Sequence, residues 1–424
     1  MKRKLCEFLD ASVTSYHAVS ECKKILLESG FTELSETDSW LLLAGASYFF
    51  MRGGSLIAFK IPLGKASSFL LASAHSDSPA FLVKDERCEG TYTRLSVEKY
   101  GGPIDESWFD RPLSLGGRVM ISTPNGIKER LIRMEDTLLI PSLAPHLSKD
   151  VKNKEKDVKT DLLPLWCDGE KRLSSALASE LCCAEEDILG RDLYLFSAQK
   201  AFLWNGDKYI SSPRLDDLQC VFALLHGLIS AESRNAVSLL AVFDHEEIGS
   251  RSSAGADSSL LEGTLERISF LLGKNDEEYA KMLGASFMIS ADNAHAVHPA
   301  HPELADGEGG RVYMNGGIVI KHSAAHRYAT DAFSEAMLVA LAKRENIPYQ
   351  SYYNRPDMRG GTTLGPISLC HATVPTVDVG LAQLAMHSAN ETAGAEDTLY
   401  LTALARAYFS SSLSRVGDVY KWTK

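Results

Sequence analysis

Apolar runs of strand length that end directly on a histidine or a carboxylate constrain this chain more than any other feature. Residues 67–75, 237–244 and 285–292 are such runs, and they end on His75, Asp244 and Asp292. Continuous apolar runs of this length are typical of strands that are buried on both faces of a sheet. In open α/β sheets, functional groups gather at the carboxyl ends of the strands. We therefore expect these polar side chains to lie along one edge of a buried sheet.

Helical and β-rich segments follow one another in an order that predicts two domains. Amphipathic helical patterns cover residues 15–30, 331–343 and 395–412, among the buried strands. From residue 84 to residue 207 the pattern changes to short alternating β-like pieces that are broken by Gly and Pro. We expect an α/β fold. Its mixed-sheet α/β/α sandwich would form from residues 1–83 and 208–424, and a β-rich insert over residues 84–207 would divide it in sequence.

Charge and cysteine content exclude several classes of function. The formal net charge is -11 and no basic cluster is present, which argues against nucleic acid as a partner. No window approaches a membrane span, and the start of the chain lacks a long apolar stretch, so neither membrane insertion nor export is expected. The eight cysteines are scattered without a CxxC pair, as is typical of reduced thiols. A cytoplasmic location is expected.

Five short segments bring imidazoles and carboxylates next to apolar runs. Each alone has a simpler explanation, because a His or Asp after a strand is more often a cap or a turn residue. Together they indicate a metal site, since buried carboxylates need a compensating cation. Nitrogen and oxygen ligands without cysteine suit a hydrolytic Zn, Mn or Co site, and one bridging carboxylate can hold two ions. The segments are residues 75–77, 215–217, 245–247, 291–293 and 386–388.

The adjacent pair Glu246 and Glu247 fits a division of labour, in which one carboxylate binds metal and the other stays free as a proton acceptor. The segment is not an HExxH motif, because Gly249 stands where the second histidine would be. The sequence also lacks a GxSxG nucleophile elbow, a GxxxxGK[ST] phosphate loop and a GxGxxG after a strand. By themselves, the residues predict a metal-dependent hydrolase.

The same residues lie in a series of motifs that resembles the aspartyl aminopeptidases, a family of co-catalytic metallopeptidases. The motifs occur in the family's order and span almost the whole chain. They are SAHSDSP (73–79), SPRLDD (212–217), DHEEIGS (244–250), SADNAHAVHP (290–299), GGTTLGPI (360–367) and LAMHS (384–388).

The resemblance implies a set of metal ligands. His75 and Asp292 would bind one metal ion, and Glu247 and His387 would bind the other. Asp216 would bridge the two. The implied cofactors are two divalent ions per subunit, with Zn favoured and Mn or Co as alternatives.

The resemblance also implies the catalytic and substrate-binding residues. Glu246 would be the general base, and Asp77 would lie behind His75 and fix its tautomer. The expected substrates are peptides with an N-terminal Asp or Glu. Their acidic side chain requires a cation or hydrogen-bond donors in the pocket, and the matching residues are Lys321, His295 and Tyr328.

Assembly is a further implication. Family members use the insert to pair subunits and to build a tetrahedral homododecamer, so residues 84–207 would form a dimerisation domain. His146 matches a histidine that family members extend into a neighbouring subunit's active site, although an ordinary loop histidine is nearly as good an explanation.

Two departures from the family pattern leave the reaction untouched. Ser76 stands where the family often has threonine, and Ala389 and Asn390 follow the MHS motif where Ile-Arg is common. The second removes an arginine near the site. The metal core alone does not separate the expected activity from a two-metal peptidase of neutral specificity, a deacylase or a carboxypeptidase. A catalytically silent assembly scaffold is a further alternative, against which the complete ligand set and Glu246 argue.

Overall fold

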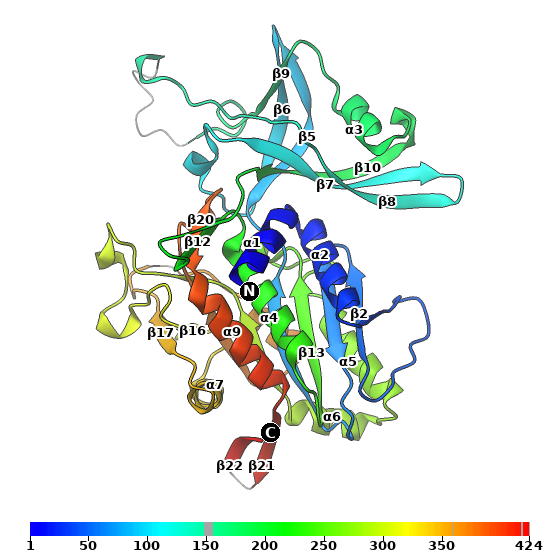
Figure 1. Ribbon diagram of the computed structural model, residues 1–424, viewed down its shortest axis with the longest axis vertical. Helices are drawn as coiled ribbons and strands as arrows, with labels where there is room; N and C mark the ends of the chain where they lie inside the picture. The colour runs from blue at the N-terminus through cyan, green and yellow to red at the C-terminus, as the bar shows by residue number, and fades with distance from the viewer. Residues whose placement is uncertain (148–155, 359, 417–418, 424) are drawn as a thin grey trace.

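A mixed sheet forms the centre of the larger part of the molecule (Figure 1). The computed structural model describes residues 1–147, 156–358, 360–416 and 419–423. Parallel pairing joins β4 to both of its neighbours, whereas β3 runs antiparallel to β13. In order across the main sheet, its strands are β1 (Thr32–Glu33), β2 (Ser47–Arg52), β3 (Ser55–Lys60), β13 (Ala236–Phe243), β4 (Ser68–His75), β14 (Phe287–Ala291), β18 (Thr376–Gly380), β16 (Ile318–His322) and β17 (Tyr349–Tyr353).

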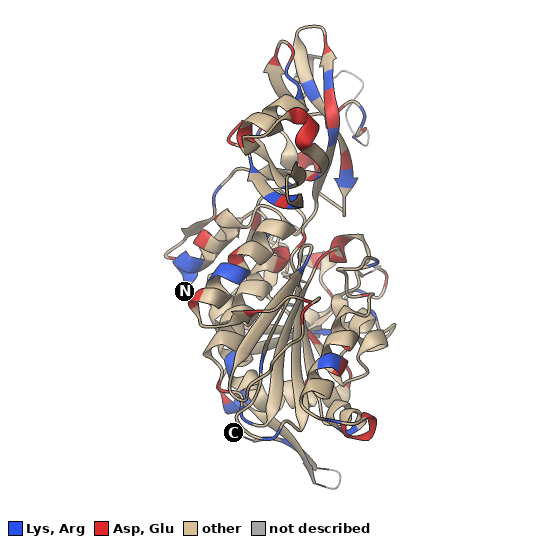
Figure 2. Cartoon of the chain, turned by 90° about the vertical axis from the view of Figure 1, so that its right-hand side faces the viewer, with Lys and Arg blue, Asp and Glu red and all other residues tan. Residues whose placement is uncertain are grey.

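Helices cover the main sheet on both sides, and Figure 2 shows the sheet between the two layers. Each face of the sheet packs against its helices in a separate apolar core, and successive side chains of a strand point to opposite faces. In β4, Leu70 and Ala72 therefore pack into one core, and Phe69 and Leu71 pack into the other. The first core includes residues of α1 (Lys2–Ala11), α2 (Ser15–Glu28), α4 (Leu215–Ser230), α7 (Ala332–Arg344) and α9 (Ala395–Phe409). The second includes residues of α5 (Leu260–Leu271), α6 (Asp276–Gly284) and α8 (Leu364–His371).

A second sheet stands apart from this sandwich, at the top of Figure 1. It has its own apolar core, which includes Phe81, Trp108 and Leu193, and α3 (Leu173–Leu181) packs there. We propose that this inserted sheet, whose first strand begins at Ala80, and α3 correspond to the insert that the sequence predicts at residues 84–207. In order, its strands are β8 (Gly126–Arg133), β7 (Leu113–Thr123), β10 (Ile188–Ser197), β5 (Ala80–Glu89), β6 (Tyr92–Tyr100) and β9 (Leu165–Asp168).

Short strands from distant segments form a third sheet, and the C-terminal hairpin pairs β21 (Ser412–Val416) with β22 (Val419–Thr423). Neither was anticipated from the sequence pattern. The strands of the third sheet, in order, are β11 (Phe202–Trp204), β12 (Tyr209–Ser212), β20 (Glu391–Gly394), β19 (Ala382–Leu384) and β15 (Ala294–His295).

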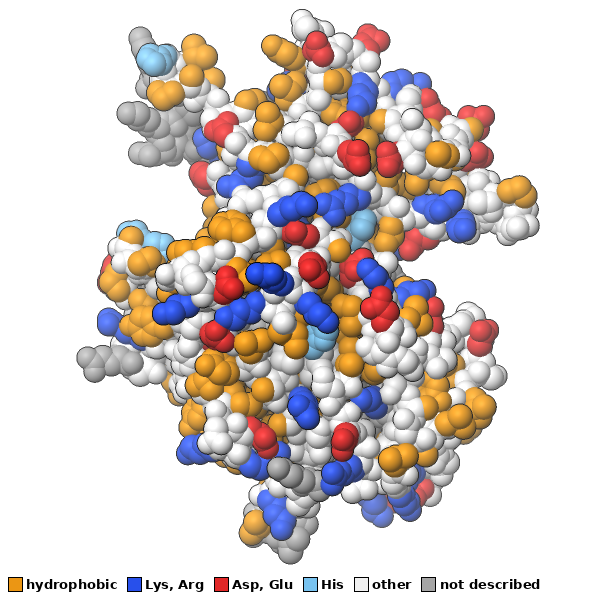
Figure 3. All heavy atoms as spheres, viewed as in Figure 1, with side chains coloured by type: hydrophobic (Ala, Val, Ile, Leu, Met, Phe, Trp, Pro, Cys, Tyr) orange, Lys and Arg blue, Asp and Glu red, His pale blue; other side chains and the backbone are white. Residues whose placement is uncertain are grey.

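The predicted fold class is confirmed: a mixed-sheet α/β sandwich is accompanied by a separate β-rich unit. Within the described part of the chain, no helix combines the length and the apolar character needed to cross a membrane. Positive and negative side chains are interspersed over the face shown in Figure 3, so that face does not present a surface of one charge.

Candidate metal centre

The ends of neighbouring strands bring the predicted ligands together. His75 is the last residue of β4, and Asp292 directly follows β14, the parallel neighbour of β4. Glu247 lies in a 3-10 turn (Glu246–Ile248) that follows β13, the other parallel neighbour. Asp216 lies in the first turn of α4 in a non-helical conformation, and His387 follows β19. The site therefore lies at the carboxyl edge of the main sheet, as the sequence predicts.

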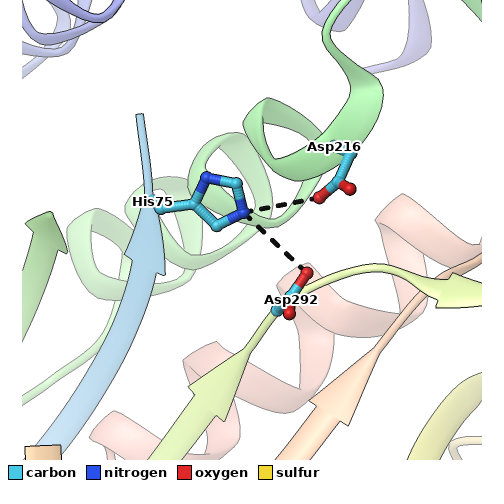
Figure 4. Close-up of side chains that lie close together, drawn as sticks. All are labelled: His75, Asp216 and Asp292. Atoms are coloured by element: carbon cyan, nitrogen blue, oxygen red, sulfur yellow. Dashed lines mark ion pairs between the residues drawn. The ribbon is translucent and has the colours of Figure 1, made fainter. Parts of the chain in front are cut away.

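A first group of ligands surrounds the His75 imidazole (Figure 4). Its Nε2 atom is 3.4 Å from Oδ1 of Asp216 and 3.9 Å from Oδ1 of Asp292. All three side chains are buried. The ligand atoms lie within 4.8 Å of one another, which is close enough for one ion to contact all three.

A second group shares Asp216 with the first. Nε2 of His387 is 3.4 Å from Oε1 of Glu247 and 3.6 Å from Oδ2 of Asp216. Asp216 therefore directs Oδ1 to one histidine and Oδ2 to the other. This is the arrangement expected of a carboxylate that bridges two ions.

The burial of their carboxylates indicates that both groups are suited to hold divalent cations. Among the described side chains, Oδ1 of Asp216 and Oε1 of Glu247 are buried without a hydrogen-bond partner. Burial, reinforced by the nearby Asp216 carboxylate, raises the pKa of Glu247 well above its usual range. Buried anions in this arrangement call for a positive charge, and imidazole with carboxylate suits a catalytic zinc or manganese site.

Glu246 lines the same cavity as the ligands but belongs to neither group. Burial raises the pKa of its carboxyl to about 8, with His75 acting against that rise and Asp292 adding to it. A carboxyl group that lies beside both candidate ligand groups and belongs to neither is free to exchange protons with water or substrate in the cavity.

Asp77 ties the first strand end to the turn that carries Glu246 and Glu247. Its backbone carbonyl is 3.0 Å from Nδ1 of His75, and its carboxylate oxygens accept the N–H groups of Glu246 and Glu247, each at 3.1 Å. Burial alone would raise the pKa of Asp77, but the hydrogen bond and charge of His75, together with the hydrogen bonds from Tyr100 and the Glu247 backbone, lower that pKa below its usual value. Asp77 thus orients His75 and the two glutamates together.

Three of the predicted substrate-binding residues line this cavity of about 340 Å³: His295, Lys321 and Tyr328. Lys321 is buried, and its ammonium lies 3.4 Å from Oδ2 of Asp292 and 5.5 Å from the centre of the Tyr328 ring. Burial alone would lower the pKa of Lys321, but nearby negative groups, with the Asp292 carboxylate foremost, raise that pKa above its usual value. The cavity therefore contains a fixed cation.

His146 is the predicted residue that the structure leaves apart from the others. It is exposed in a 3-10 turn (Pro145–Leu147) of the insert and does not line the cavity. A role in a neighbouring subunit stays a prediction for this side chain.

Sequence reasoning missed a carboxylate that holds two ligands by their backbones. Glu391 is buried, with Oε2 accepting the N–H of Asp216 at 3.0 Å and Oε1 accepting the N–H of His387 at 2.7 Å. Similarly, Oδ2 of Asp217 accepts the N–H of His75 at 3.2 Å. In the sequence, the one feature that could have indicated these two acids is that each lies within four residues of a predicted ligand.

Comparison with known proteins points to one family. The family model of the aminopeptidase I zinc metalloproteases, M18, matches residues 8–409. A probable M18 family aminopeptidase 2 from Clostridium acetobutylicum is 39% identical over 416 residues, covering 94% of this chain and 96% of the relative. A protein of the same description from Mycobacterium leprae is 36% identical over 420 residues, covering 96% and 98%.

Solved structures agree with this match over nearly the full length. Ape4, solved by cryo-EM in complex with Nbr1, has a TM-score of 0.92 at 33% identity, covering 96% of this chain and 85% of that one. The crystal structure of prApe1 has a TM-score of 0.91 at 27% identity, covering 96% and 93%. The mApe1 dodecamer of S. cerevisiae has a TM-score of 0.83 at 25% identity, covering 96% of each chain.

Proposed function

Because this chain belongs to the M18 family of zinc metallo-aminopeptidases, we propose that it uses two divalent ions to remove acidic residues from the N-termini of peptides. One observation carries the two-ion part of the proposal. Asp216 directs one carboxylate oxygen to the group of His75 and the other to the group of His387. A single ion would need only one of these groups.

The residues that would hold the ions are those of the two groups, with His75 and Asp292 on one side of Asp216, and Glu247 and His387 on the other. When bound, the ions would supply the positive charge that acidifies water and polarises the scissile carbonyl. Glu246 would accept the proton of the attacking water at its carboxylate and then donate it to the departing amine. Asp77 would hold Glu246 in place through the backbone N–H.

The preference for acidic residues is proposed on the basis of Lys321. Its ammonium is buried within the cavity of the ligands and stays charged beside Asp292. A substrate carboxylate that entered the cavity would gain a charge-assisted hydrogen bond there. His295 and Tyr328, which line the same cavity, would complete the contacts to that carboxylate.

We also propose a reducing, cytoplasmic setting and a closed oligomer. All eight cysteines are free thiols, as expected where disulfides are rare. The mApe1 structure is a dodecamer, and its chain matches this one over 96% of the length of each. A tetrahedral homododecamer, paired through the inserted sheet, would have about twelve times the 46.4 kDa of the chain, which sedimentation analysis measures directly.

Hydrolysis of aspartyl, glutamyl, leucyl and lysyl chromogenic substrates tests reaction, cofactor and specificity together. We expect the two acidic substrates to be cleaved fastest. Activity should disappear on chelation and return when Zn, Mn or Co is added back. Faster cleavage of the leucyl substrate would favour the alternative with neutral specificity, and absence of turnover on all four would leave the scaffold alternative.

A variant of Lys321 tests the specificity pocket separately. Lys321→Ala is expected to lose about tenfold or more in kcat/KM on glutamyl and aspartyl substrates, because a hydrogen bond to a charged group contributes roughly 1.5 to 3 kcal/mol. Cleavage of the leucyl substrate measures any indirect damage to Asp292, and Lys321→Arg serves as the charge-retaining control. Equal losses on acidic and neutral substrates would remove Lys321 from the specificity pocket.

A further inference from the structure

The end of strand β6 brings the inserted sheet into contact with the metal centre. We call residues 100–102 the β6 tip. Tyr100 is the last residue of β6, and its backbone pairs with that of Ala80 inside the inserted sheet. From there the β6 tip approaches Asp77, which orients His75 of the first ligand group, and it also approaches Glu247 and His387 of the second ligand group.

Tyr100 contacts the first ligand group through Asp77. Its hydroxyl donates to Oδ2 of Asp77 at 2.7 Å, the same oxygen that accepts the N–H of Glu247. A buried carboxylate keeps its orientation when its oxygens are saturated with donors. Without the hydroxyl, this oxygen would lose its shortest hydrogen bond, and Asp77 would hold His75 and the glutamate turn less firmly.

Gly102 contacts the second ligand group directly. Its carbonyl oxygen lies 3.0 Å from Nδ1 of His387, and this contact favours the tautomer with a proton on Nδ1. The tautomer leaves Nε2 free, which is the atom that faces Glu247 and Asp216. Two residues further on, the N–H of Ile104 donates to the carbonyl of His387 at 3.0 Å, so the backbone is held as well.

Gly101 allows the β6 tip to come this close. Its φ angle of +67° lies in the left-handed region, and a Cβ atom there would stand 3.1 Å from Cβ of Glu247. Only glycine adopts this conformation without strain and leaves the required space. The approach is therefore built into the sequence of the tip.

We propose that the β6 tip is a positioning element through which the inserted sheet holds both groups of metal ligands, and that Tyr100 is a positioning residue that acts through Asp77. This inference rests on the proposed two-metal function. It gives the insert a role within the subunit, in addition to any role in assembly. Disturbing the contact should therefore weaken metal binding while the fold stays intact.

Tyr100→Phe removes the hydroxyl and keeps the ring, and Tyr194→Phe is the matched control. The two rings pack edge to face with their centres 5.4 Å apart, so both substitutions delete a hydroxyl in the same region. We would strip the full-length protein of metal, titrate it with Zn²⁺ or Mn²⁺ by calorimetry, and record the absorption spectrum of each cobalt-loaded protein. Kinetics at saturating metal would separate kcat from KM.

For Tyr100→Phe we expect the metal Kd to rise roughly 10- to 100-fold, as is usual when a partner of a metal ligand is lost. The cobalt spectrum should change, and kcat should fall while KM stays constant. The metal-free protein should unfold at the wild-type temperature, and Tyr194→Phe should resemble wild type throughout. A Kd within twofold of wild type, or an equal loss in Tyr194→Phe, would overturn the inference alone. Wild-type protein that binds no metal would instead overturn the proposed function.

Discussion

Two adjacent glutamates illustrate how neighbouring residues acquire different chemistry. Glu247 faces His387 at 3.4 Å within the second ligand group, whereas Glu246 lies outside both groups and lines the cavity. Asp77 holds their backbones through separate carboxylate oxygens. The consecutive N–H groups are thus fixed together, while only the Glu247 side chain belongs to a ligand group.

The same substitution at these two positions should separate catalysis from metal binding. Glu246→Gln is expected to keep its metal and to lose about 10²- to 10⁴-fold in kcat, the usual contribution of a general base. Glu247→Gln should instead lose the metal of the second group. Metal content by atomic emission and kcat on an aspartyl substrate measure the two effects. A Glu246→Gln variant with near-normal turnover would remove it from proton transfer.

The residues that could be predicted from sequence differ in kind from those that were missed. His75 and Asp292 stand at the ends of apolar strands, so hydrophobic periodicity is enough to place them at one edge of the sheet. Glu391 and Tyr100 act through hydrogen bonds between segments 175 and 23 residues apart in the chain. No periodic pattern reports such a contact, because it depends on how separate elements pack.

Close packing of α4 against α9 gives a prediction at the scale of helices. A Cβ atom on Gly227 of α4 would collide with Cβ of Ala405 and lie 3.0 Å from the backbone nitrogen of Arg406. Gly263 in α5 has nothing within 4 Å of the same position. Gly227→Ala should therefore destabilise the protein by about 1 to 3 kcal/mol through overpacking, whereas Gly263→Ala should stabilise it by about 0.5 to 1 kcal/mol through helix propensity.

Urea unfolding of the two variants measures both free energies. The pair is informative because the substitution is identical and only the surroundings differ. If Gly227→Ala were as stable as wild type, α9 would be able to move away from α4, and the tight helix contact would not be required for the fold.

Helix α2 carries a histidine whose titration should be visible in the stability of the protein. His17 lies in the first turn of α2, with Nδ1 2.8 Å from Oγ1 of Thr14. Burial, together with Arg133 and Arg214, lowers the pKa of His17 to about 4 from a usual value of 6.5. Between these two pH values the unfolded chain binds a proton at His17 that the folded protein does not bind. The contribution of His17 to the free energy of unfolding is therefore complete above pH 6.5 and is lost as the pH falls toward 4.

Between pH 7 and pH 5, this single group should reduce the free energy of unfolding by about 2 kcal/mol. Urea unfolding of metal-free protein at the two pH values measures the difference. His17→Gln should show a decrease smaller by that amount, and His146→Gln, at an exposed position, is the control. An unchanged pH dependence in His17→Gln would mean that the pKa of His17 is the same in the folded and unfolded protein.

Where a helical pattern in the sequence is long, the structure contains a helix at that position. The helical pattern at 331–343 became α7 (Ala332–Arg344), with Asp331 accepting the N–H of Ser334 as its cap. The third sheet was not predicted, because its strands β15 and β19 are only two and three residues long. Segments this short show no periodicity, and pairing with distant partners decides that they become strands.

At the scale of the whole molecule, the metal centre lies where three sheets meet. His75 ends a strand of the main sheet, His387 follows β19 of the third sheet, and Gly102 reaches His387 from the inserted sheet. Sequence patterns predicted the main and inserted sheets as separate units, but not that the end of β6 would reach His387. Because His75 ends a strand of the main sheet and His387 follows a strand of the third sheet, ions bound to the ligand groups would join those two sheets.

Removing metal should therefore destabilise the molecule as a whole. Ligand that binds only the folded state stabilises it by RT ln(1 + [L]/Kd), or about 4 kcal/mol at a thousandfold excess over Kd. Calorimetric unfolding across a series of Zn²⁺ concentrations should show a midpoint that rises with the logarithm of free metal and falls on chelation. Asp216→Asn is the informative comparison, because it removes one buried negative charge from both ligand groups. Its metal-free form should be no less stable than metal-free wild type, yet it should gain little from added metal. A wild-type midpoint independent of metal would show that the three sheets hold together without the ions, and that the buried carboxylates are neutralised by protons instead.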